Sequence, residues 1–322
     1  MPDSPTPNRS DLAGAAQPPE RSPDPQTVST KPLGLWADTW RRLKRNKLAL
    51  VGLGIITVFM VVGLVEVLFW VTGWHGGYLA PYNPDGVNYS ITKAAPSLAH
   101  PFGTDYIGRD VFSRTLVAAR ISLLVGVIAV GIALVIGLAL GPVSGYYGGA
   151  IDAVIMRIAD VFFAFPFILF VLLLLVVLGP GFRNVFIAIG ILSWAGYARL
   201  VRGTVLSVKT QEYIEAAKAA GSSDLRIIFG HVLPNSMAPV YVAIAMGVGG
   251  AIVTEAALSF LGIGVQPPTA SWGNMISEYT NYLQAGQWWM TLFPSVALVL
   301  TVFGFISFGN GLRDATDPKL KE

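Results

Sequence analysis

The sequence predicts an all-α polytopic membrane protein with six transmembrane helices. Hydrophobic residues make up 53% of the 322 residues and charged residues only 13%, whereas a soluble domain usually carries about 25% charged residues. Six apolar segments approach the roughly 20 residues that a helix needs to cross a hydrocarbon core of about 30 Å. The basic residues gather in alternate connections between these segments, as the positive-inside rule requires.

The residues before the first apolar segment divide into two parts. Residues 1–34 contain eight prolines and no aromatic residue, so they cannot bury enough apolar surface to fold and are expected to form a disordered cytoplasmic tail. In residues 35–47, Trp36, Trp40 and Leu43 share one helical face beside five basic residues. This pattern favours an amphipathic helix on the membrane surface, and a basic flank that only sets orientation is the alternative.

The six predicted spans follow one another along the chain from residue 48 to residue 312. They cover 48–72, part of 121–151, 161–178, 184–206, 237–261 and 289–312. The first span leads into an extracytoplasmic loop, residues 73–118, and the other five form a helical core, residues 119–312. Pro166 predicts a kink in the third span. Close helix packing is predicted for the second span by its glycines at four-residue spacing, which are Gly137, Gly141 and Gly145.

The distribution of basic residues predicts the orientation in the membrane. With the N-terminus in the cytoplasm, 17 of the 22 Lys and Arg residues lie on the cytoplasmic side. Both termini are then cytoplasmic, and residues 313–322 form a second cytoplasmic tail. Residues 206–236 form a cytoplasmic loop between the fourth and fifth spans.

Charged residues inside the predicted spans are candidate functional groups, because charge is costly at mid-bilayer depth. Asp160 follows Arg157 by three residues, a spacing that predicts an ion pair at the cytoplasmic end of the third span; a substrate contact is the alternative. Glu255 lies deep in the fifth span, where it either lines the pathway or bonds polar groups between two subunits. Arg199 and Arg202 must reach water or face protein.

The extracytoplasmic side carries two further patterns. Arg109, Asp110 and Arg114 predict a packed polar corner, with substrate binding as the alternative. Aromatic residues cluster between the last two spans, which is typical of an interfacial belt. They are Trp272, Tyr279, Tyr282, Trp288 and Trp289.

The cytoplasmic loop reads as two short helices joined by a glycine. Residues 213–220 are strong helix formers, Gly221 suits a helix C-terminus, and Ser222 or Ser223 can cap the second helix. Pro234 marks a boundary before the fifth span. The alanines of the first helix would let another protein approach its backbone closely, but an ordinary helical linker explains the same residues.

The loop also carries a motif. EAAKAAG, nine further residues and HVLP resemble the EAA motif of binding-protein-dependent ABC importer permeases. The matching residues are Glu215, Ala216, Ala217, Gly221, Leu233 and Pro234. His231 stands where the general pattern has an apolar residue, and histidine there is typical of the oligopeptide/dipeptide branch. Residues 100–126, 145–166 and 258–275 also resemble that branch, and the resemblance covers residues 36–318.

The resemblance implies a type I ABC importer permease with a cytoplasmic coupling helix, in the bacterial inner membrane. Its implied partners are a second permease subunit, two cytoplasmic ATPase subunits, an extracytoplasmic substrate-binding protein and the lipid bilayer, without nucleic acid. Glu215 would make a polar contact with the ATPase, while Ala216, Ala217 and Gly221 would allow close approach and turning. No Gly-Lys dipeptide, and therefore no P-loop, occurs in the sequence, so ATP and Mg²⁺ would act in the partners, and this chain is expected to bind no cofactor.

Two other classes of membrane protein find less support. An intramembrane enzyme needs a nucleophile, paired acids or a metal cluster, but the chain has no cysteine and its three histidines lie far apart. A channel needs a selectivity element, and no segment stands out as one. The residues leave the solute open among dipeptides, oligopeptides, nickel chelates and other small solutes.

Deleting residues 1–30 tests the interpretation of the N-terminal segment. We expect the shortened chain to insert and to assemble as the full chain does, because a segment without apolar surface contributes little to packing. Size-exclusion chromatography of the detergent-solubilised protein measures this. Loss of assembly would show that the segment forms an essential contact.

Overall fold

The computed structural model describes residues 35–73 and 79–316 of the chain. The predicted tail, residues 1–34, lies outside the described residues. In that part of the chain the structure is almost entirely helical, and its β-structure is limited to one isolated bridge between Thr104 and Asp110. The all-α prediction is therefore confirmed.

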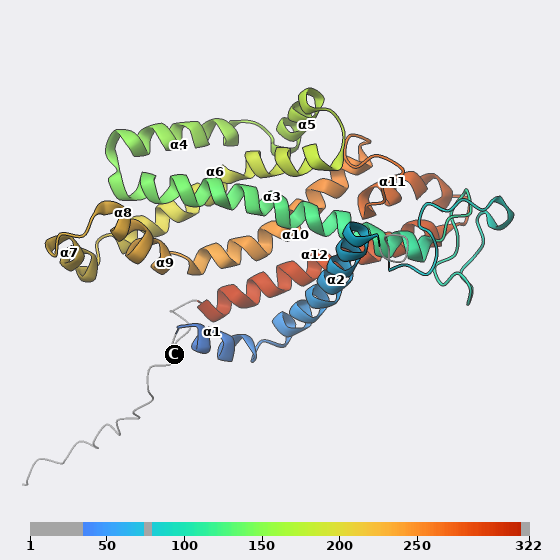
Figure 1. The fold of residues 1–322 in the computed structure, drawn as a ribbon, viewed down its shortest axis with the longest axis horizontal. Coiled ribbons are helices and arrows are strands. Elements are labelled where there is room, and N and C mark those ends of the chain that lie inside the picture. Colours follow the sequence, from blue (N-terminus) through green and yellow to red (C-terminus); the bar gives the residue numbers. More distant parts are fainter. Residues whose placement is uncertain (1–34, 74–78, 317–322) are drawn as a thin grey trace, which may run out of the picture. The chain divides into compact units, whose positions relative to one another are not determined.

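The chain divides into two compact units, Met1–Asp38 and Thr39–Glu322, and the second contains the helices that could cross a membrane. The helices follow one another in the order α1 (Leu35–Leu43), α2 (Lys47–Thr72), η3 (Tyr89–Ile91), α3 (Val111–Tyr147), α4 (Gly149–Ala164), α5 (Phe167–Leu178), α6 (Phe182–Val208), α7 (Glu212–Ala219), α8 (Asp224–Ile227), η4 (Ile228–Val232), α9 (Leu233–Asn235), α10 (Ala238–Phe260), α11 (Trp272–Leu283) and α12 (Trp288–Thr316) (Figure 1). By length and composition α2, α3, α6, α10 and α12 can each cross a membrane, and the bent pair α4 and α5 makes six spans when counted as one.

The third span differs from the prediction. Instead of one kinked helix over 161–178, the chain forms α4 and α5, which meet at an angle of 92°. Phe165 has extended backbone angles, φ −102° and ψ 142°, because a residue before proline avoids the helical region. Pro166 is therefore the residue before α5, not a residue inside a helix, and the predicted kink is a complete break.

The second span begins earlier than predicted. Helix α3 starts at Val111, inside the segment 73–118 that was predicted to be a loop and ahead of residue 119, where the helical core was predicted to begin. Asp110 caps the helix by accepting a hydrogen bond from the backbone N–H of Ser113, at 2.7 Å. Hydropathy did not predict this part of the helix, because its first turns contain polar residues, including Arg114.

Glycines bring α3 and α6 into close contact, as their spacing predicted. A methyl group added to Gly137 would lie 2.6 Å from Cβ of Tyr197, and one added to Gly141 would lie 2.8 Å from the carbonyl oxygen of Ala198. Gly145 meets the side chain of Val205 in the same way. The core of this unit is built on this contact, with α10 and α12 packed against it.

The predicted aromatic belt is wrong for three of its members. Trp272, Tyr279 and Trp289 are buried, because their polar atoms find partners inside the protein. The indole N–H of Trp272 donates to the carbonyl oxygen of Thr115 at 3.0 Å, and the Tyr279 hydroxyl donates to Asp105 at 3.0 Å. Trp288, by contrast, remains exposed.

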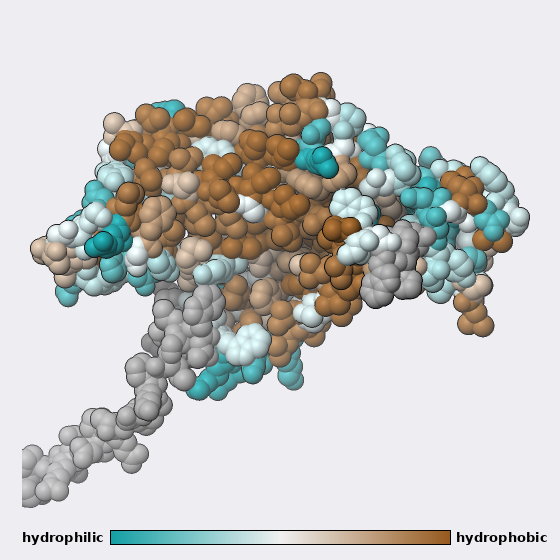
Figure 2. Space-filling model, viewed as in Figure 1, coloured by the Kyte–Doolittle hydropathy of each residue, from teal (hydrophilic) through white to brown (hydrophobic). Residues whose placement is uncertain are grey.

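Figure 2 shows a broad apolar surface over the long helices. Val135 on α3 is 72% exposed, and Val176 on α5 is 73% exposed. Exposed apolar area of this extent suits a lipid environment. Polar residues gather instead at the two ends, around α7 and around the loop that precedes α3.

Replacing Gly141 with leucine tests the contact between α3 and α6. The larger side chain has no room beside Ala198, so we expect a loss of at least about 2 kcal/mol of stability, as overpacking typically causes. Gly131→Leu on the same helix is the matched control, since no heavy atom lies within 4 Å of the added group. Thermal unfolding in detergent measures both variants, and equal melting temperatures would contradict the packing.

Candidate functional site

The loop between α6 and α10 is anchored by apolar side chains on its inner side. Ile214, Ile227 and Val232 are fully buried. They pack in one cluster with Val201 and Val205 of α6. The loop is therefore a fixed protrusion of the helical core, since moving it would expose this cluster.

The turn after α7 has the geometry that the sequence predicts. Gly221 adopts φ +76°, a region that favours glycine. Its backbone N–H donates to the carbonyl oxygen of Lys218 at 2.9 Å, and the N–H of Ser222 donates to that of Ala217 at 3.1 Å. These two bonds form a Schellman motif, which fixes the direction of the chain from α7 towards α8. Ser223 occupies the position before α8 but forms no capping hydrogen bond with its side chain.

The motif residues do not all face the same way. Glu215 and Ala216 are exposed, whereas Ala217 is half-buried against the cluster that anchors the loop. Leu233 is half-buried and Pro234 is exposed at the start of α9. The predicted alanine face therefore divides into an inward-facing and an outward-facing part.

Apolar side chains stand exposed beside these outward-facing motif residues. Tyr213, Leu225 and Phe229 each expose about half of their surface or more. Exposed aromatic and aliphatic side chains on one loop are typical of a surface that another protein covers.

A set of contacts that the sequence analysis missed ties this loop to α3. The Tyr146 hydroxyl donates to Asp224 at 2.8 Å, and the Lys218 ammonium lies 5.3 Å from the centre of the Tyr146 ring. The ammonium of Lys209 donates to the carbonyl oxygen of Gly145 at 2.7 Å. No local pattern could have shown these contacts, because they join residues about 60 to 80 positions apart in the chain.

Asp160 has a different partner from the one predicted. Its carboxylate accepts from Arg199 of α6 at 2.6 Å, not from Arg157. The error arose because three-residue spacing brings two side chains close only when no other helix competes, and α6 lies alongside α4. Arg202 likewise binds the carboxylate of Asp152 with two nitrogens, at 2.5 and 2.6 Å, so Arg199 and Arg202 each pair with a carboxylate of α4.

Glu255 is fully buried within the chain. It accepts a hydrogen bond from the Ser259 hydroxyl at 2.7 Å and lies beside Ser122 of α3 and Ser271 before α11. In this structure its carboxylate therefore joins three segments of one chain. A pathway or inter-subunit role for Glu255 stays a prediction.

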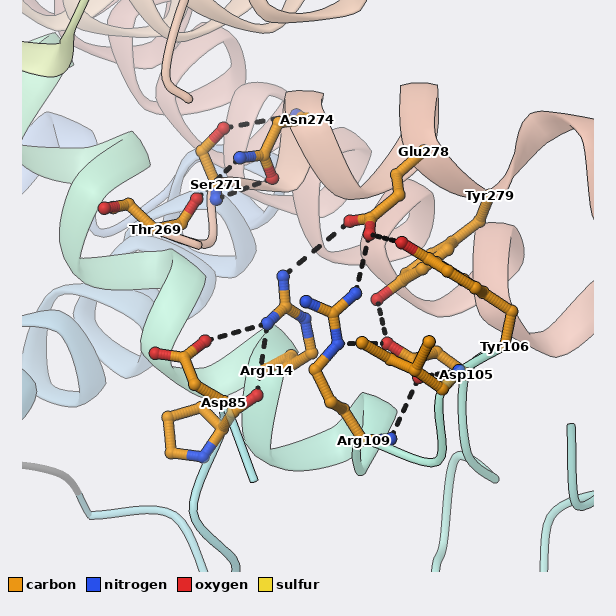
Figure 3. Close-up of polar contacts among 12 residues, drawn as sticks. Asp85, Asp105, Tyr106, Arg109, Arg114, Thr269, Ser271, Asn274, Glu278 and Tyr279 are labelled. Carbon is orange, nitrogen blue, oxygen red and sulfur yellow. Dashed lines mark hydrogen bonds and ion pairs between the residues drawn. The ribbon is translucent and has the colours of Figure 1, made fainter. Parts of the chain in front are cut away.

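A second polar cluster lies at the opposite end of α3 (Figure 3). Arg109 donates to Asp105 at 2.5 Å and to Glu278 of α11 at 2.6 Å. Arg114, whose side chain is 0% exposed, donates to Asp85 at 3.0 Å. The predicted packed corner is thus present, but its central carboxylates, Asp105 and Glu278, were not singled out from the sequence.

Two tyrosines complete this cluster. The hydrogen bond from Tyr106 to the Glu278 carboxylate, together with burial, raises the pKa of Tyr106 to about 12. Burial also raises the pKa of Tyr279, which donates to Asp105. Asp110 lies outside the arginine network, because it caps α3 and pairs with His100 at 2.9 Å. The cluster holds the loop before α3 against α11.

The acidic and histidine side chains form no metal site in the described part of the chain, where no three of them come together. The polar groups of the two ends instead bind one another or face the surface. Together the two ends present an anchored protrusion and a rigid ionic corner, joined by α3 (Figure 1). The described part of the chain is thus a helical scaffold with an ordered polar region at each end of α3.

Comparison with known families identifies this scaffold. Residues 133–322 match the family model of the binding-protein-dependent transport system inner membrane component. Residues 34–101 match the N-terminal transmembrane domain of oligopeptide transport permease C. The chain belongs to the family of binding-protein-dependent transport system inner membrane components, and it is a multi-pass permease of an ABC transporter.

Individual relatives agree over nearly the whole chain. The dipeptide transport system permease protein of Bacillus subtilis (strain 168) is 41% identical over 94% of this chain and 91% of its own length. The corresponding protein of Alkalihalophilus pseudofirmus is 44% identical, with 94% and 96% covered. The oligopeptide transport system permease protein of B. subtilis (strain 168) is 42% identical, with 93% and 94% covered. All three are permeases by name, not enzymes.

A solved structure supports the fold. A chain of a methionine ABC transporter superposes with a TM-score of 0.50 at 19% sequence identity, covering 63% of this chain and 97% of that chain. The fold is that of a type I importer permease, as the sequence predicts.

Replacing Glu278 with alanine tests the ionic corner. The change removes a carboxylate that pairs with both Arg109 and Arg114, while Asp105 and Asp85 remain as partners. We therefore expect a loss of about 2 kcal/mol, as for a buried hydrogen bond to a charged group. Thr280→Ala on the same helix is the control, because its exposed hydroxyl bonds only to the carbonyl oxygen of Ile276, and it should change stability by less than about 0.5 kcal/mol. Thermal unfolding in detergent compares them, and equal stability would refute a structural role for the cluster.

Proposed function

We propose that this chain is a permease subunit of an ATP-driven importer of peptides or similar small solutes, and that α7 is its coupling helix. The observation that carries the proposal is the orientation of α7. Ile214 anchors the helix in a buried cluster, while Glu215 and Ala216 of the same helix are exposed. A helix held rigidly from one side and open on the other can transmit a push from a bound partner. Peptides are proposed as the solute because the dipeptide and oligopeptide permeases named above are the similar proteins.

The partner on α7 would be an ATPase subunit. A groove on that subunit would receive Ala216 at close range and pair a polar group with Glu215, as a surface helix docks in a groove. The exposed side chains of Tyr213, Leu225 and Phe229 would add apolar contact area. Leu233 and Pro234 would support the protrusion from its far side.

Force that enters at α7 would reach the spans by two routes. The first passes through Tyr146 and Asp224 to α3. The second passes through the buried Ile214 to Val201 and Val205 of α6. Because α3 and α6 pack through glycines without intervening side chains, they would move together when the ATPase subunits close. Such a rigid movement between two global states is the requirement for alternating access.

The complete transporter would contain further subunits. A second homologous permease would form the other half of the pathway, two ATPase subunits would hold ATP and Mg²⁺, and a substrate-binding protein would dock on the extracytoplasmic side. The α7 end would be cytoplasmic, with both chain termini, because the basic residues concentrate there. The ionic corner around Arg109 would then be extracytoplasmic and give the binding protein a rigid surface.

Affinity purification of the tagged chain from native membranes tests the proposal. We expect an ATPase and a second permease to copurify, with ATP hydrolysis stimulated by peptide and the binding protein. Ala216→Trp should remove the ATPase from the complex, because the indole fills the space that a groove would occupy. The control Val135→Trp adds the same bulk to an exposed apolar position on α3 and should retain the ATPase.

The outcome is read from the copurified subunits and from ATP hydrolysis. An ATPase retained by Ala216→Trp at the level of the control would overturn the coupling role of α7. A wild-type chain that purifies without any ATPase would overturn the proposed function as a whole.

A further inference from the structure

A charged pair stands half-exposed on the faces of α4 and α6. Arg199 donates to Asp160 at 2.6 Å, and their side chains are 46% and 53% exposed. The guanidinium carbon of Arg199 also lies 4.3 Å from the centre of the Phe163 ring. The pair is thus ordered by contacts on one side and open on the other.

The pair lies within the membrane-crossing length of α6, nearer to the end that leads to α7 than to its other end. Asp152 of α4 binds Arg202 of α6, and the ammonium of Lys209, which follows α6, binds the end of α3, so these segments share one end of the unit. At about 1.5 Å per residue, Asp160 lies about 17 Å from the first residue of α4, and Arg199 lies about 14 Å from the last residue of α6. Helix α6 has 27 residues and is therefore about 40 Å long, which places Arg199 about 26 Å from its first residue.

Lipid cannot cover such a pair. Charged side chains in membrane-crossing segments face protein or a water-filled cavity, because hydrocarbon does not solvate them. The half-exposed side of this pair must therefore meet protein or water in the assembled transporter.

The charge of Arg157 favours water over protein on the open side of the ion pair. Arg157 is exposed on α4, one turn from Asp160, and has no ion-pair partner among the described residues. The face therefore carries two cations against one anion. A dry interface would need a carboxylate from another subunit to compensate Arg157, whereas water solvates this cation without one.

The neighbouring surface is suited to the passage of a solute. On α6, Gly196 and Gly203 are exposed, and no heavy atom lies within 4 Å of a side chain added to either. A cavity of about 270 Å³ also lies against α6, lined by residues of α3, α5, α6 and α10. Its polar lining residues are Ser193, Tyr197 and Thr254.

We propose that this face of α4 and α6 forms part of the wall of the water-filled route through the transporter, and that its excess positive charge favours solutes that carry a carboxylate. The proposal rests on the proposed function, since it assigns the solute pathway of that permease to a surface. A solute carboxylate would meet Arg157 or the outer side of Arg199. Asp160 would hold Arg199 in place and prevent a site so positive that a solute could not leave it.

Thiol labelling tests the proposal, because the chain has no cysteine of its own. Gly196→Cys places one thiol on the proposed wall, and Val176→Cys places one on the exposed apolar side of α5. Both variants are assembled with cysteine-free partner subunits in proteoliposomes and treated with membrane-impermeant methanethiosulfonates. We expect the thiol at position 196 to react at least about tenfold faster than that at 176, which lipid would shield.

Reagents of opposite charge test whether the wall favours solutes that carry a carboxylate. Relative to a free thiol in solution, the anionic reagent should react faster than the cationic one at position 196. Adding Arg157→Gln should lower this preference by about two- to threefold, since one nearby positive charge is lost. If Gly196→Cys fails to assemble, Gly203→Cys on the same face takes its place.

Each result separates this inference from the proposed function. Equal labelling of positions 196 and 176 in a complex that hydrolyses ATP in response to solute would overturn the wall and leave the function intact. A preference for the cationic reagent would overturn the selection of carboxylates. A chain that recruits no ATPase would overturn the proposed function instead, and the wall with it.

Discussion

Hydrocarbon cannot solvate a charge or an unpaired polar group, and the arrangement of this permease follows from that constraint. Within the long helices, Arg202 is held by Asp152, Arg199 by Asp160, and Glu255 by Ser259. Each partner comes from the same chain. The two ion pairs link α4 to α6, whereas Ser259 belongs to the same helix as Glu255. The Arg199–Asp160 pair is open on one side, and Arg157 has no ion-pair partner among the described residues. Water or another subunit has to stabilise these charges.

The second organising contact is the one between α3 and α6. Glycines on α3 remove the side chains that would separate the two backbones, and the resulting fit leaves little room for sliding. Helix α3 is also anchored by polar contacts at both ends, through Arg114 in the ionic corner and Tyr146 at the loop that contains α7 and α8. One rigid helix therefore connects the ionic corner with that loop.

Several features were predictable because they depend on neighbours in sequence. The helix before Gly221, the turn at that glycine and the apolar spans all follow from local preference or from hydropathy. The glycine contact was predictable too, because a four-residue repeat places small residues on one helical face. The predicted partner of Asp160 and the interfacial position of Trp272 were wrong, because both depended on helices that are distant in sequence.

The sequence by itself determined that the chain is helical, that its helices are long enough to cross a membrane and that it belongs with the EAA permeases. Those properties are sums over local residues or a motif read in order. Only the tertiary structure decided that Ala217 faces inwards while Ala216 faces outwards, that α4 and α5 break apart at 92°, and that Glu278 completes a corner with Arg109. These features depend on packing. Which side chains meet is set by how helices distant in the chain come together, and local preferences do not predict that.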